Sequence, residues 1–549
     1  MWPNPLHISR AAFFLNALIL AAGARPEVFV QLFEWSWPDI EKECREFLGP
    51  KGFAAVQISP AVEHAKLAGQ WYERYQPVSY KLVSRSGSEA QLRSMIQTCK
   101  EAGVKIYADV VFNHMAAGCG IGYAGTPFCN RSYQMWQQED FHHFPHLLSG
   151  NCGIDWARWK HVKATDGDPP AEIIWNCDLA GLPDLASEKE HVQETIAQHL
   201  RHVLDLGAEG LRIDAAKHMK PEHIHEIFAR VKSSGSFPSD IPLELFSKEK
   251  KPVKPSMYLD VGQIEYFGYS KLVTNAISNA SQLGLLVGID EKFAYPSTDV
   301  VVFLDNHDTQ RDGVAKLTYR NASLYTMANV FMLAWPYGYP KLMSSFYIPD
   351  ERTDGIDQGP PQIPVHAENR LTCQDGRNWV CEHRIPAIAN MVAWRRVAGL
   401  AAPRHFIEES GVHIAFGRGS AFLAMNRNTS TWHAKLQTGL PSGFYCDVSQ
   451  SDDPRLCPHI FVDHEGFAVV AVPSVSTTAF HIGAKAATMF SLSQVPFSFV
   501  FFACGCLLLS IFGIATFRSF SWCSREASLT SPSRHSDKHS LKSSLLVVE

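Results

Sequence analysis

Apolar and polar residues alternate along several short segments of the chain, which is the pattern of β-strands whose two faces differ. The segment GLRIDAAKH at 210–218 shows it most clearly, because Leu211 and Ile213 are apolar and Arg212 and Asp214 alternate with them. The period of two places the guanidinium and the carboxylate on one face, where Arg212 can hold Asp214 ionised. A carboxylate at the carboxyl end of a buried strand is the usual catalytic position in a (β/α)8 barrel.

Apolar runs of strand length recur along the chain, and helical patterns such as that at 191–207 lie between them. Alternating strands and helices form a parallel sheet, and at this length the sheet is expected to close as a TIM barrel of the α/β class. The expected barrel strands are 28–33, 54–59, 104–112, 210–215, 241–246, 300–306 and 339–345.

Two further strand ends carry the same arrangement. The strings DVVFNH at 109–114 and VVFLDNHD at 301–308 each place polar side chains just past a run of apolar residues. Since the carboxyl ends of parallel strands meet at one rim of a barrel, the three strand ends predict one shared site. The polar residues expected there, besides Asp214, are Asp109, Asn113, His114, Asn306, His307 and Asp308.

Two parts of the chain interrupt or follow this alternation. Residues 115–182 are rich in Gly, Pro and Cys and show no helical period, so they predict a small domain inserted after the third strand. From residue 406 the pattern becomes short strands separated by turns, which predicts a C-terminal antiparallel β domain over 406–485. The barrel itself is then expected to comprise 25–114 and 183–405.

Both ends of the chain carry apolar segments that the barrel does not need. Residues 1–24 combine a basic residue, an apolar core and small residues at a cleavage position, which indicates a secretory signal peptide. The uncharged run at 495–517 is long enough to cross a bilayer, and Arg518 and Arg525 follow it. We therefore expect a type I single-pass membrane protein in a lipid bilayer, with an extracellular or lumenal catalytic domain and a disordered cytosolic tail at 518–549.

Composition narrows the function classes. With 549 residues, 46% of them hydrophobic, the chain can bury more than one core, and a net charge of −5 gives no basic footprint for nucleic acid. Ten of the 13 cysteines lie between residues 44 and 457, an even number that predicts disulfides in an oxidising compartment. We expect a monomeric glycoprotein, with sequons at Asn130, Asn279, Asn321 and Asn428.

Several longer strings carry a resemblance to a known family. Together with the three strand ends, QLFEWSWPDIEKEC, KGFAAVQISP, WYERYQPVSYKL, NWVCEHR and HIAFGRG resemble the α-amylase family of glycoside hydrolases, and the animal-type α-amylases in particular, over roughly residues 27–482. The resemblance implies an enzyme that hydrolyses internal α-1,4-glucosidic bonds of starch or glycogen-like glucans with retention. Two alternatives stay open: an exo-acting α-glucosidase or transglycosylase of the same family, and a catalytically inactive amylase-like ectodomain.

The resemblance also implies most of the disulfide pairing. It pairs Cys44 with Cys99, Cys152 with Cys177, Cys373 with Cys381 and Cys446 with Cys457, and it leaves Cys119 and Cys129 as the remaining pair. The apolar run at 495–517 is a departure, because ordinary animal amylases lack such an anchor.

Retaining glycoside hydrolysis needs two carboxyl groups that flank the bond, one as nucleophile and one as acid and then base. Asp214 matches the family's nucleophile, and the resemblance makes Asp308 the third carboxylate, which holds the distorted sugar. The region IPLELFSKEKKPVKPS at 241–256 departs from the family pattern, so the acid remains open. We favour Glu244, which ends an apolar strand and keeps the downstream strings in line with the family. The candidates are Glu244, Glu249, Asp260 and Glu265.

The remaining site residues follow from the same resemblance. Aromatic residues of WYERYQP form a platform for glucose rings, two histidines bind hydroxyls of the central sugar, and Lys217 reaches the leaving-group side of the cleft. The expected substrate-binding residues are Trp71, Tyr72, Tyr75, Gln76, His114, Arg212, Lys217, His218 and His307.

Two ions are expected from the family. Oxygen ligands suit calcium, and the matching positions are Asn113, Asp184 and the backbone carbonyls near Trp175 and of His218. Animal-type amylases also bind chloride through two arginines and an asparagine, and the corresponding residues here are Arg212, Asn306 and Lys341. A lysine lacks the bidentate fork of arginine, so Lys341 either completes a chloride site or replaces the ion.

Overall fold

The fold is described from a computed structural model of the chain. The residues that the structure describes are 25–142, 153–154, 169–233, 235, 237–348, 357–368 and 370–486. The predicted signal peptide at 1–24, the predicted helix at 495–517 and the predicted tail at 518–549 lie outside these residues.

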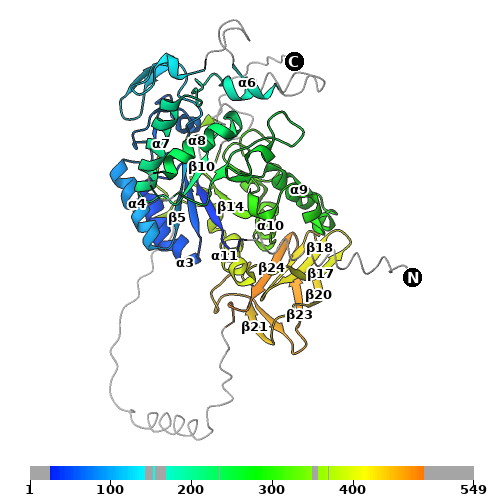
Figure 1. The fold of residues 1–549 in the computed structure, drawn as a ribbon. Helices are drawn as coiled ribbons and strands as arrows, with labels where there is room; N and C mark the ends of the chain where they lie inside the picture. Colours follow the sequence, from blue (N-terminus) through cyan, green and yellow to red (C-terminus); the bar gives the residue numbers. More distant parts are fainter. Residues whose placement is uncertain are drawn as a thin grey trace, which may run out of the picture. The chain divides into compact units, whose positions relative to one another are not determined.

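Eight parallel strands form a closed barrel, as the sequence predicts (Figure 1). Around the barrel each strand pairs with its neighbour in the chain, and the pairing of β1 with β14 closes the ring. The strands are β1 (Phe29–Leu32), β2 (Ala55–Ile58), β5 (Lys105–Val110), β10 (Gly210–Ile213), β11 (Pro242–Leu243), β12 (Gln263–Glu265), β13 (Val300–Val302) and β14 (Tyr339–Ser344).

The inside of the barrel is packed rather than hollow. Near its amino-terminal end, the ring of Phe29 lies 5.4 Å from that of Tyr107 and 4.6 Å from that of Tyr339. A Cβ atom on Gly210 would stand 2.3 Å from the ring of Tyr107, so the first residue of β10 has to be glycine. These packed rings fill the amino-terminal end of the barrel, which leaves the carboxyl end as the face on which a site can form.

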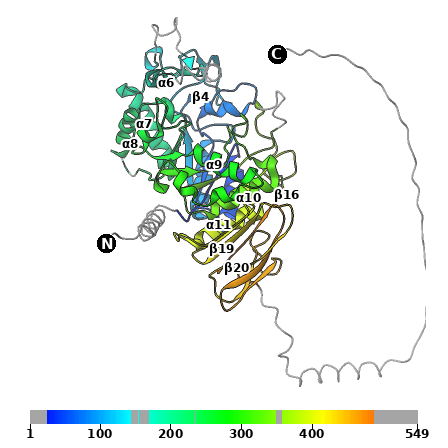
Figure 2. The same cartoon turned by 90° about the vertical axis from the view of Figure 1, so that its right-hand side faces the viewer.

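Helices between the strands cover the outside of the barrel (Figure 2). The helix expected at 191–207 is confirmed as α7 (Glu190–Asp205), which buries Val192, Ile196, Leu200 and Val203 at the spacing of one helical face. The others are α2 (Trp37–Glu43), α3 (Gly49–Lys51), α4 (Glu89–Glu101), α8 (Pro221–Lys232), α9 (Phe267–Ser278), α10 (Ala322–Ala334) and α11 (Pro386–Ala398).

A small domain is inserted between β5 and β10, after the third barrel strand as expected. Its elements are short, because the segment lacks long apolar runs, and one of its hairpins is closed by the disulfide between Cys119 and Cys129. The elements are β6 (Cys119–Ile121), β7 (Pro127–Cys129), β8 (Gly153–Ile154), α6 (Ala171–Asn176) and β9 (Asp178–Leu179).

The C-terminal part consists of two four-stranded antiparallel sheets, in the orders β17-β18-β19-β24 and β20-β23-β22-β21 (Figure 1). The first sheet packs against the barrel helix α11, where the indole of Trp394 donates to the carbonyl of Phe422 at 3.0 Å. The strands are β17 (Pro403–Glu409), β18 (His413–Arg418), β19 (Ala421–Asn426), β20 (Trp432–Gln437), β21 (Gly443–Cys446), β22 (His459–Val462), β23 (Phe467–Val472) and β24 (Ser476–His481).

The disulfides follow the expected pairing. The four bonded pairs within the described residues are Cys44–Cys99, Cys119–Cys129, Cys373–Cys381 and Cys446–Cys457. Cys177 is also disulfide-bonded, and its expected partner Cys152 lies outside the described residues.

One barrel strand was not expected from the sequence. β12 is only three residues long and reads Gln-Ile-Glu, which is too short to show a period of two. The barrel register defines it, since Ile264 pairs with Leu243 on one side and with Val300 on the other.

The prediction of a single-pass membrane protein needs correction. Among the described residues, no helix has both the length and the apolar character that crossing a bilayer requires. The expectation had rested on the length of the segment at 495–517, its lack of charge and the arginines that follow it, all outside the part of the chain that the structure describes. Neither a bilayer partner nor the localisation built on it is retained.

Candidate active site

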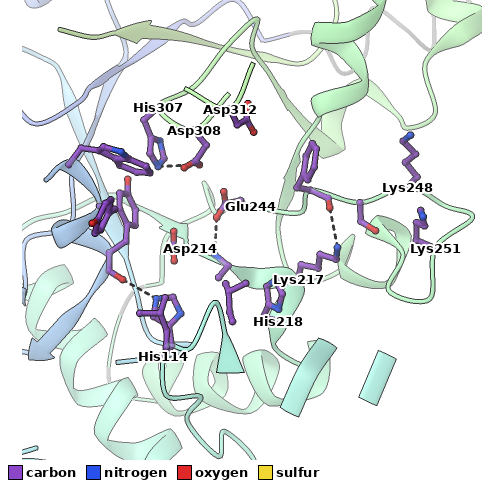
Figure 3. A pocket seen from close by; sticks show the side chains of 18 residues that line it. His114, Asp214, Lys217, His218, Glu244, Lys248, Lys251, His307, Asp308 and Asp312 are labelled. Atoms are coloured by element: carbon purple, nitrogen blue, oxygen red, sulfur yellow. Dashed lines mark hydrogen bonds and ion pairs between the residues drawn. The ribbon is translucent and has the colours of Figure 1, made fainter. Parts of the chain in front are cut away.

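A cavity of about 570 Å³ opens at the carboxyl ends of the barrel strands (Figure 3). Asp214 and Glu244 stand at its centre, with Asp308 beside them. The remaining lining residues are Trp71, Tyr72, Tyr75, His114, Leu179, Leu182, Ala215, Lys217, His218, Phe246, Ser247, Lys248, Lys251, His307 and Asp312.

A single guanidinium beneath the cavity holds three carboxyl groups. Arg212, on β10 and only 1% exposed, donates from Nη1 to Asp214 Oδ1 at 2.8 Å and to Asp109 Oδ1 at 2.7 Å. Its Nη2 lies 3.0 Å from Glu244 Oε2. Since these carboxyl groups follow or lie on β10, β5 and β11, the register of three adjacent strands brings them to one cation.

Backbone geometry at the end of β10 fixes which carboxyl oxygens stay available. Ala215 adopts φ 49°, a left-handed conformation that costs energy for a residue with a Cβ atom. Its N–H thereby donates to Glu244 Oε2 at 3.0 Å, the same oxygen that Arg212 contacts. Both bonds leave Glu244 Oε1, and likewise Asp214 Oδ2, without a hydrogen-bond partner among the described residues.

The four candidates for the acid occupy different surroundings. Glu249 is bound by Ser256 and by the hydroxyl of Tyr295 at 2.8 Å, away from the cavity. Asp260 is an exposed surface residue opposite His225. Glu265 is fully buried in the barrel and paired with Lys341. Among the four, Glu244 is the one that lines the cavity.

Burial dominates the electrostatics of these carboxyl groups. Burial and then the neighbouring Glu244 raise the pKa of Asp214, and they raise the pKa of Asp308 to about 8, although Arg212 opposes both shifts. Arg212 lowers the pKa of Asp214, as expected, but burial and Glu244 outweigh it, so the net direction is upward. One cation is shared among several carboxyl groups, and it cannot offset both their burial and their mutual repulsion.

Aromatic residues and histidines form one side of the cavity. The ring of Tyr75 stacks on that of His307 at 4.8 Å, and Trp71 meets His307 edge-on at 5.7 Å. His307 Nε2 lies 3.3 Å from Asp308 Oδ2, and His114 Nε2 donates to the carbonyl of Tyr75 at 2.9 Å. Burial lowers the pKa of His114 to about 4 and holds that of His307 well below its ordinary value, so both rings are neutral at pH 7.

The other side of the cavity is basic. Lys217 donates from Nζ to the carbonyl of Phe246 at 3.3 Å, and Lys248 and Lys251 line the same wall, on the right of the view in Figure 3. Sequence reasoning did not single out these last two lysines, nor Phe246. They lie in the segment after β11 that has no regular period, and the only signal was its density of lysine.

Two predicted substrate-binding residues do not line the cavity. Arg212 lies beneath the carboxyl groups and contacts them instead. Gln76 accepts a hydrogen bond from the backbone of Ala117 at 3.3 Å and so supports the start of the inserted domain.

The residues expected to bind calcium lie where the inserted domain meets the barrel. His114 and Asp184 form a backbone bridge, which brings Asn113 and Asp184 into neighbouring positions, and Asn113 Oδ1 is buried without a partner among the described residues. The Asp184 carboxylate is bound by His142 at 2.6 Å. Within the described residues no three acidic, His or Cys side chains gather as a metal cluster. An orphaned amide oxygen beside one carboxylate nevertheless suits calcium, which also accepts backbone carbonyls.

The residues expected to bind chloride surround a protein carboxylate. Lys341 is ion-paired with Glu265, whose other oxygen lies 3.9 Å from Arg212 Nε. Burial opposes ionisation, but Lys341 and Arg212 outweigh it and lower the pKa of Glu265. Arg212 Nε and Asn306 Nδ2 have no hydrogen-bond partner among the described residues. An ionised carboxylate thus already supplies negative charge where chloride was expected.

Family models and individual relatives identify the same protein family. The chain matches the model of the α-amylase catalytic domain over residues 46–243 and that of the α-amylase C-terminal all-β domain over 407–483. It is 40% identical over 484 residues to an α-amylase of Pecten maximus, a match that covers 83% of this chain and 92% of the relative. It is 38% identical to the pancreatic α-amylase of Homo sapiens over 77% of this chain and 87% of that one.

Solved structures agree with the sequence matches. The crystal structure of α-amylase I from Eisenia fetida is similar with a TM-score of 0.73 and 32% identity, over 84% of this chain and 98% of that chain. A substituted form of that worm enzyme, solved in complex with maltohexaose, matches equally well, with a TM-score of 0.73.

Proposed function

Because the chain belongs to the α-amylase family of glycoside hydrolases, we propose that its Arg212-linked carboxyl groups carry out the reaction of that family. The protein is a retaining α-amylase, which hydrolyses internal α-1,4-glucosidic bonds of starch or glycogen-like glucans. The observation that carries the residue assignment is that one buried guanidinium contacts both Asp214 and Glu244 at the floor of the cavity. A retaining enzyme needs its two carboxyl groups about 5–5.5 Å apart, and a shared guanidinium keeps them close.

We assign the nucleophile to Asp214 and the acid to Glu244. Arg212 engages Asp214 Oδ1, so Oδ2 is the oxygen that attacks the anomeric carbon and forms the glycosyl ester. Arg212 and Ala215 engage Glu244 Oε2, so Oε1 carries the proton that passes to the departing glucosidic oxygen. Glu244 then takes a proton from water, which hydrolyses the ester and restores Asp214.

The remaining residues bind and orient the glucan. Asp308 lies next to His307, and its raised pKa allows it to meet the sugar either as an acceptor or as a donor. Neutral His114 and His307 each combine a donor with an acceptor, which suits sugar hydroxyls. Trp71, Tyr72 and Tyr75 offer apolar ring faces to the glucose units.

Calcium would be held by Asn113, Asp184 and the carbonyls near Trp175 and of His218. Its charge would bind the inserted domain to the barrel and so shape one wall of the cleft. Asp184 is the one carboxylate of this set and the residue whose loss should matter most.

Substitution of Asp214 by Asn tests the assignment of the nucleophile. An amide cannot form the glycosyl ester at a useful rate, so we expect hydrolysis of soluble starch to fall about 10⁴-fold or more. Circular dichroism and the melting temperature serve as the folding control. Turnover within tenfold of the parent enzyme would remove Asp214 from this role.

The products of the parent enzyme test the mode of cleavage. Short oligosaccharides present from the start of the reaction indicate internal cleavage, whereas an exo-acting enzyme would release single glucose units.

A further inference from the structure

A polar side chain points into the barrel from its first strand. β1 reads Phe-Val-Gln-Leu, and its period of two places Gln31 on the same face as Phe29, whose ring packs inside the barrel. Gln31 is only 1% exposed. A buried amide costs free energy unless it finds a hydrogen-bond partner, so a glutamine at this inward position needs a reason beyond packing.

The partner of Gln31 is a histidine of the catalytic cavity. The amide nitrogen of Gln31, which can only donate, lies 3.2 Å from Nδ1 of His307. Its Oε1 atom has no hydrogen-bond partner among the described residues. The reverse orientation of the amide would leave both of its N–H groups unpaired instead, and buried N–H groups without a partner are rarer in proteins than such carbonyl oxygens. Gln31 therefore donates to Nδ1 of His307.

The ring of His307 is held on its other sides as well. It stacks against Tyr75 at 4.8 Å and against Phe33 at 4.9 Å. The carbonyl of His307 accepts a hydrogen bond from the buried guanidinium of Arg311. This packing opposes a rotation that would exchange the two ring nitrogens. The other nitrogen, Nε2, faces the cavity and lies 3.3 Å from Asp308 Oδ2 (Figure 3).

The contact with Gln31 decides which ring nitrogen carries the proton. Burial, and then the charge of Arg212, holds the pKa of His307 well below its ordinary value, so the ring is neutral and has one N–H group. A neutral imidazole whose Nδ1 accepts a hydrogen bond carries its proton on Nε2. A sugar hydroxyl can accept a hydrogen bond from that N–H group while it donates to the carboxyl of Asp308.

We propose that Gln31 is a positioning residue, which keeps the ring proton of His307 on Nε2 and so makes His307 a donor to a hydroxyl of the bound glucose unit. The inference rests on the proposed function, because a glucan in the cavity supplies the hydroxyl. Gln31 itself does not line the cavity and acts through His307.

A double-mutant cycle in the full chain tests whether Gln31 acts through His307. Gln31→Met keeps the length of the side chain and removes the amide. We expect it to lower kcat on a maltooligosaccharide of defined length about tenfold and to change KM less than about twofold, because the hydrogen bond matters most in the transition state. In the His307→Gln background the same substitution should lower kcat less than about twofold. An unchanged kcat in Gln31→Met, or an equal loss in both backgrounds, overturns the proposal.

Gln57→Met is the matched control. Gln57 pairs with Gln31 in the register of β1 and β2, is equally buried, and donates to Asp109 at 3.3 Å rather than to His307. Its substitution should change kcat by the same factor with and without His307→Gln. Coupling to His307 as strong as that of Gln31→Met would mean that any change in this layer of the barrel reaches the histidine, and would overturn the specific role of Gln31.

Nitrogen NMR of isotope-labelled histidine rings gives a readout that needs no substitution of Gln31. The signals that disappear in His307→Gln belong to His307. We expect the chemical shift of a protonated nitrogen for Nε2 and that of an unprotonated nitrogen for Nδ1. The opposite assignment overturns the proposal.

Asp214→Asn separates this inference from the proposed function. High activity of Asp214→Asn would contradict the proposed function and, with it, the role of Gln31. An inactive Asp214→Asn together with additive effects of Gln31→Met and His307→Gln would overturn the role of Gln31 alone.

Discussion

At the scale of single residues, Arg212 explains why the carboxyl groups gather where they do. It touches Asp214, Glu244 and Asp109 and lies near Glu265, so one cation is shared by carboxyl groups from four strands. Burial and repulsion consequently raise the pKa of Asp214 rather than lower it.

The role of Glu244 can be tested through the leaving group. We expect Glu244→Gln to lower kcat/KM on starch by about 10²–10⁴-fold, because the departing alkoxide is basic and needs a proton. An activated aryl maltoside, whose leaving group departs without protonation, should lose far less. Rates on the two substrates give the comparison.

Glu249→Gln is the control for this test. Its carboxylate binds Ser256 and Tyr295 outside the cavity, so the loss on starch should be small and equal for both substrates. A selective loss in this variant, with none in Glu244→Gln, would exchange the two assignments.

Lys341 gives a second prediction at this scale. Because the ionised Glu265 already balances Lys341, an added anion would meet a buried negative charge, and we expect activity to change little with chloride at constant ionic strength. Lys341→Arg keeps the cation and leaves Glu265 in place, so chloride should have little effect on that variant as well. The measurement is a pH–rate profile in which chloride is exchanged for an inert anion. Strong chloride activation of the parent would show that lysine completes an anion site.

At the scale of elements, a buried carboxylate ties the first helix of the barrel to the connection after its last strand. Glu43, at the end of α2, accepts hydrogen bonds from His366 at 2.7 Å, from His383 at 2.9 Å and from Arg384 at 2.7 Å. Its side chain is wholly buried. The contact thus joins the two βα-units that meet where β1 pairs with β14.

We expect Glu43→Gln to lower the free energy of unfolding by about 3–5 kcal/mol, because the guanidinium of Arg384 loses its anion and two buried histidines lose their carboxylate partner. Burial alone would raise the pKa of Glu43, but hydrogen bonds from His366, His383 and Arg384 hold it well below its ordinary value. Glu43 therefore contributes its full stabilisation above about pH 5. This contribution declines at lower pH, because the carboxylate takes up a proton more readily in the unfolded chain than in the folded one. Urea unfolding at pH 7 and pH 4 measures both effects.

Glu46→Gln removes an exposed charge three residues further along the chain and serves as the control. It should change the free energy of unfolding by less than about 0.5 kcal/mol at either pH. A loss in Glu43→Gln no larger than this would mean that the cluster does not hold the two units together.

At the scale of the whole molecule, the cleft depends on the junction between the inserted domain and the barrel. The inserted domain supplies Leu179 and Leu182 to the cavity wall, and the bridge between His114 and Asp184 anchors it at the rim. An ion bound by Asn113 and Asp184 would act at this junction.

We expect excess chelator to lower the melting temperature and added calcium to restore it, since an ion that binds only the native state stabilises it by mass action. Asp184→Asn should abolish this response, because it removes the one carboxylate of the proposed site. Differential scanning calorimetry of both proteins, with and without chelator, provides the comparison. An unchanged melting temperature of the parent in excess chelator would count against the calcium site.

The sequence by itself determined the barrel and the strand-end positions of two carboxylates of the candidate site. Periodicity is a local property, so seven of the eight barrel strands, the amphipathic α7 and the strand-end location of Asp214 and Asp308 could be predicted from neighbouring residues alone. The resemblance of longer strings added the family and the disulfide pairing.

Only the tertiary structure decided among groups that look alike in sequence. Glu244, Glu249 and Glu265 were all candidates for the acid in the sequence. Barrel register and loop contacts place Glu244 in the cavity, Glu249 at the surface and Glu265 against Lys341. The same holds for β12, which is too short to show a period, and for Lys248, whose loop has none. Contacts such as Lys341 with Glu265 and Tyr295 with Glu249 join residues far apart in the chain, and a local pattern carries no information about them.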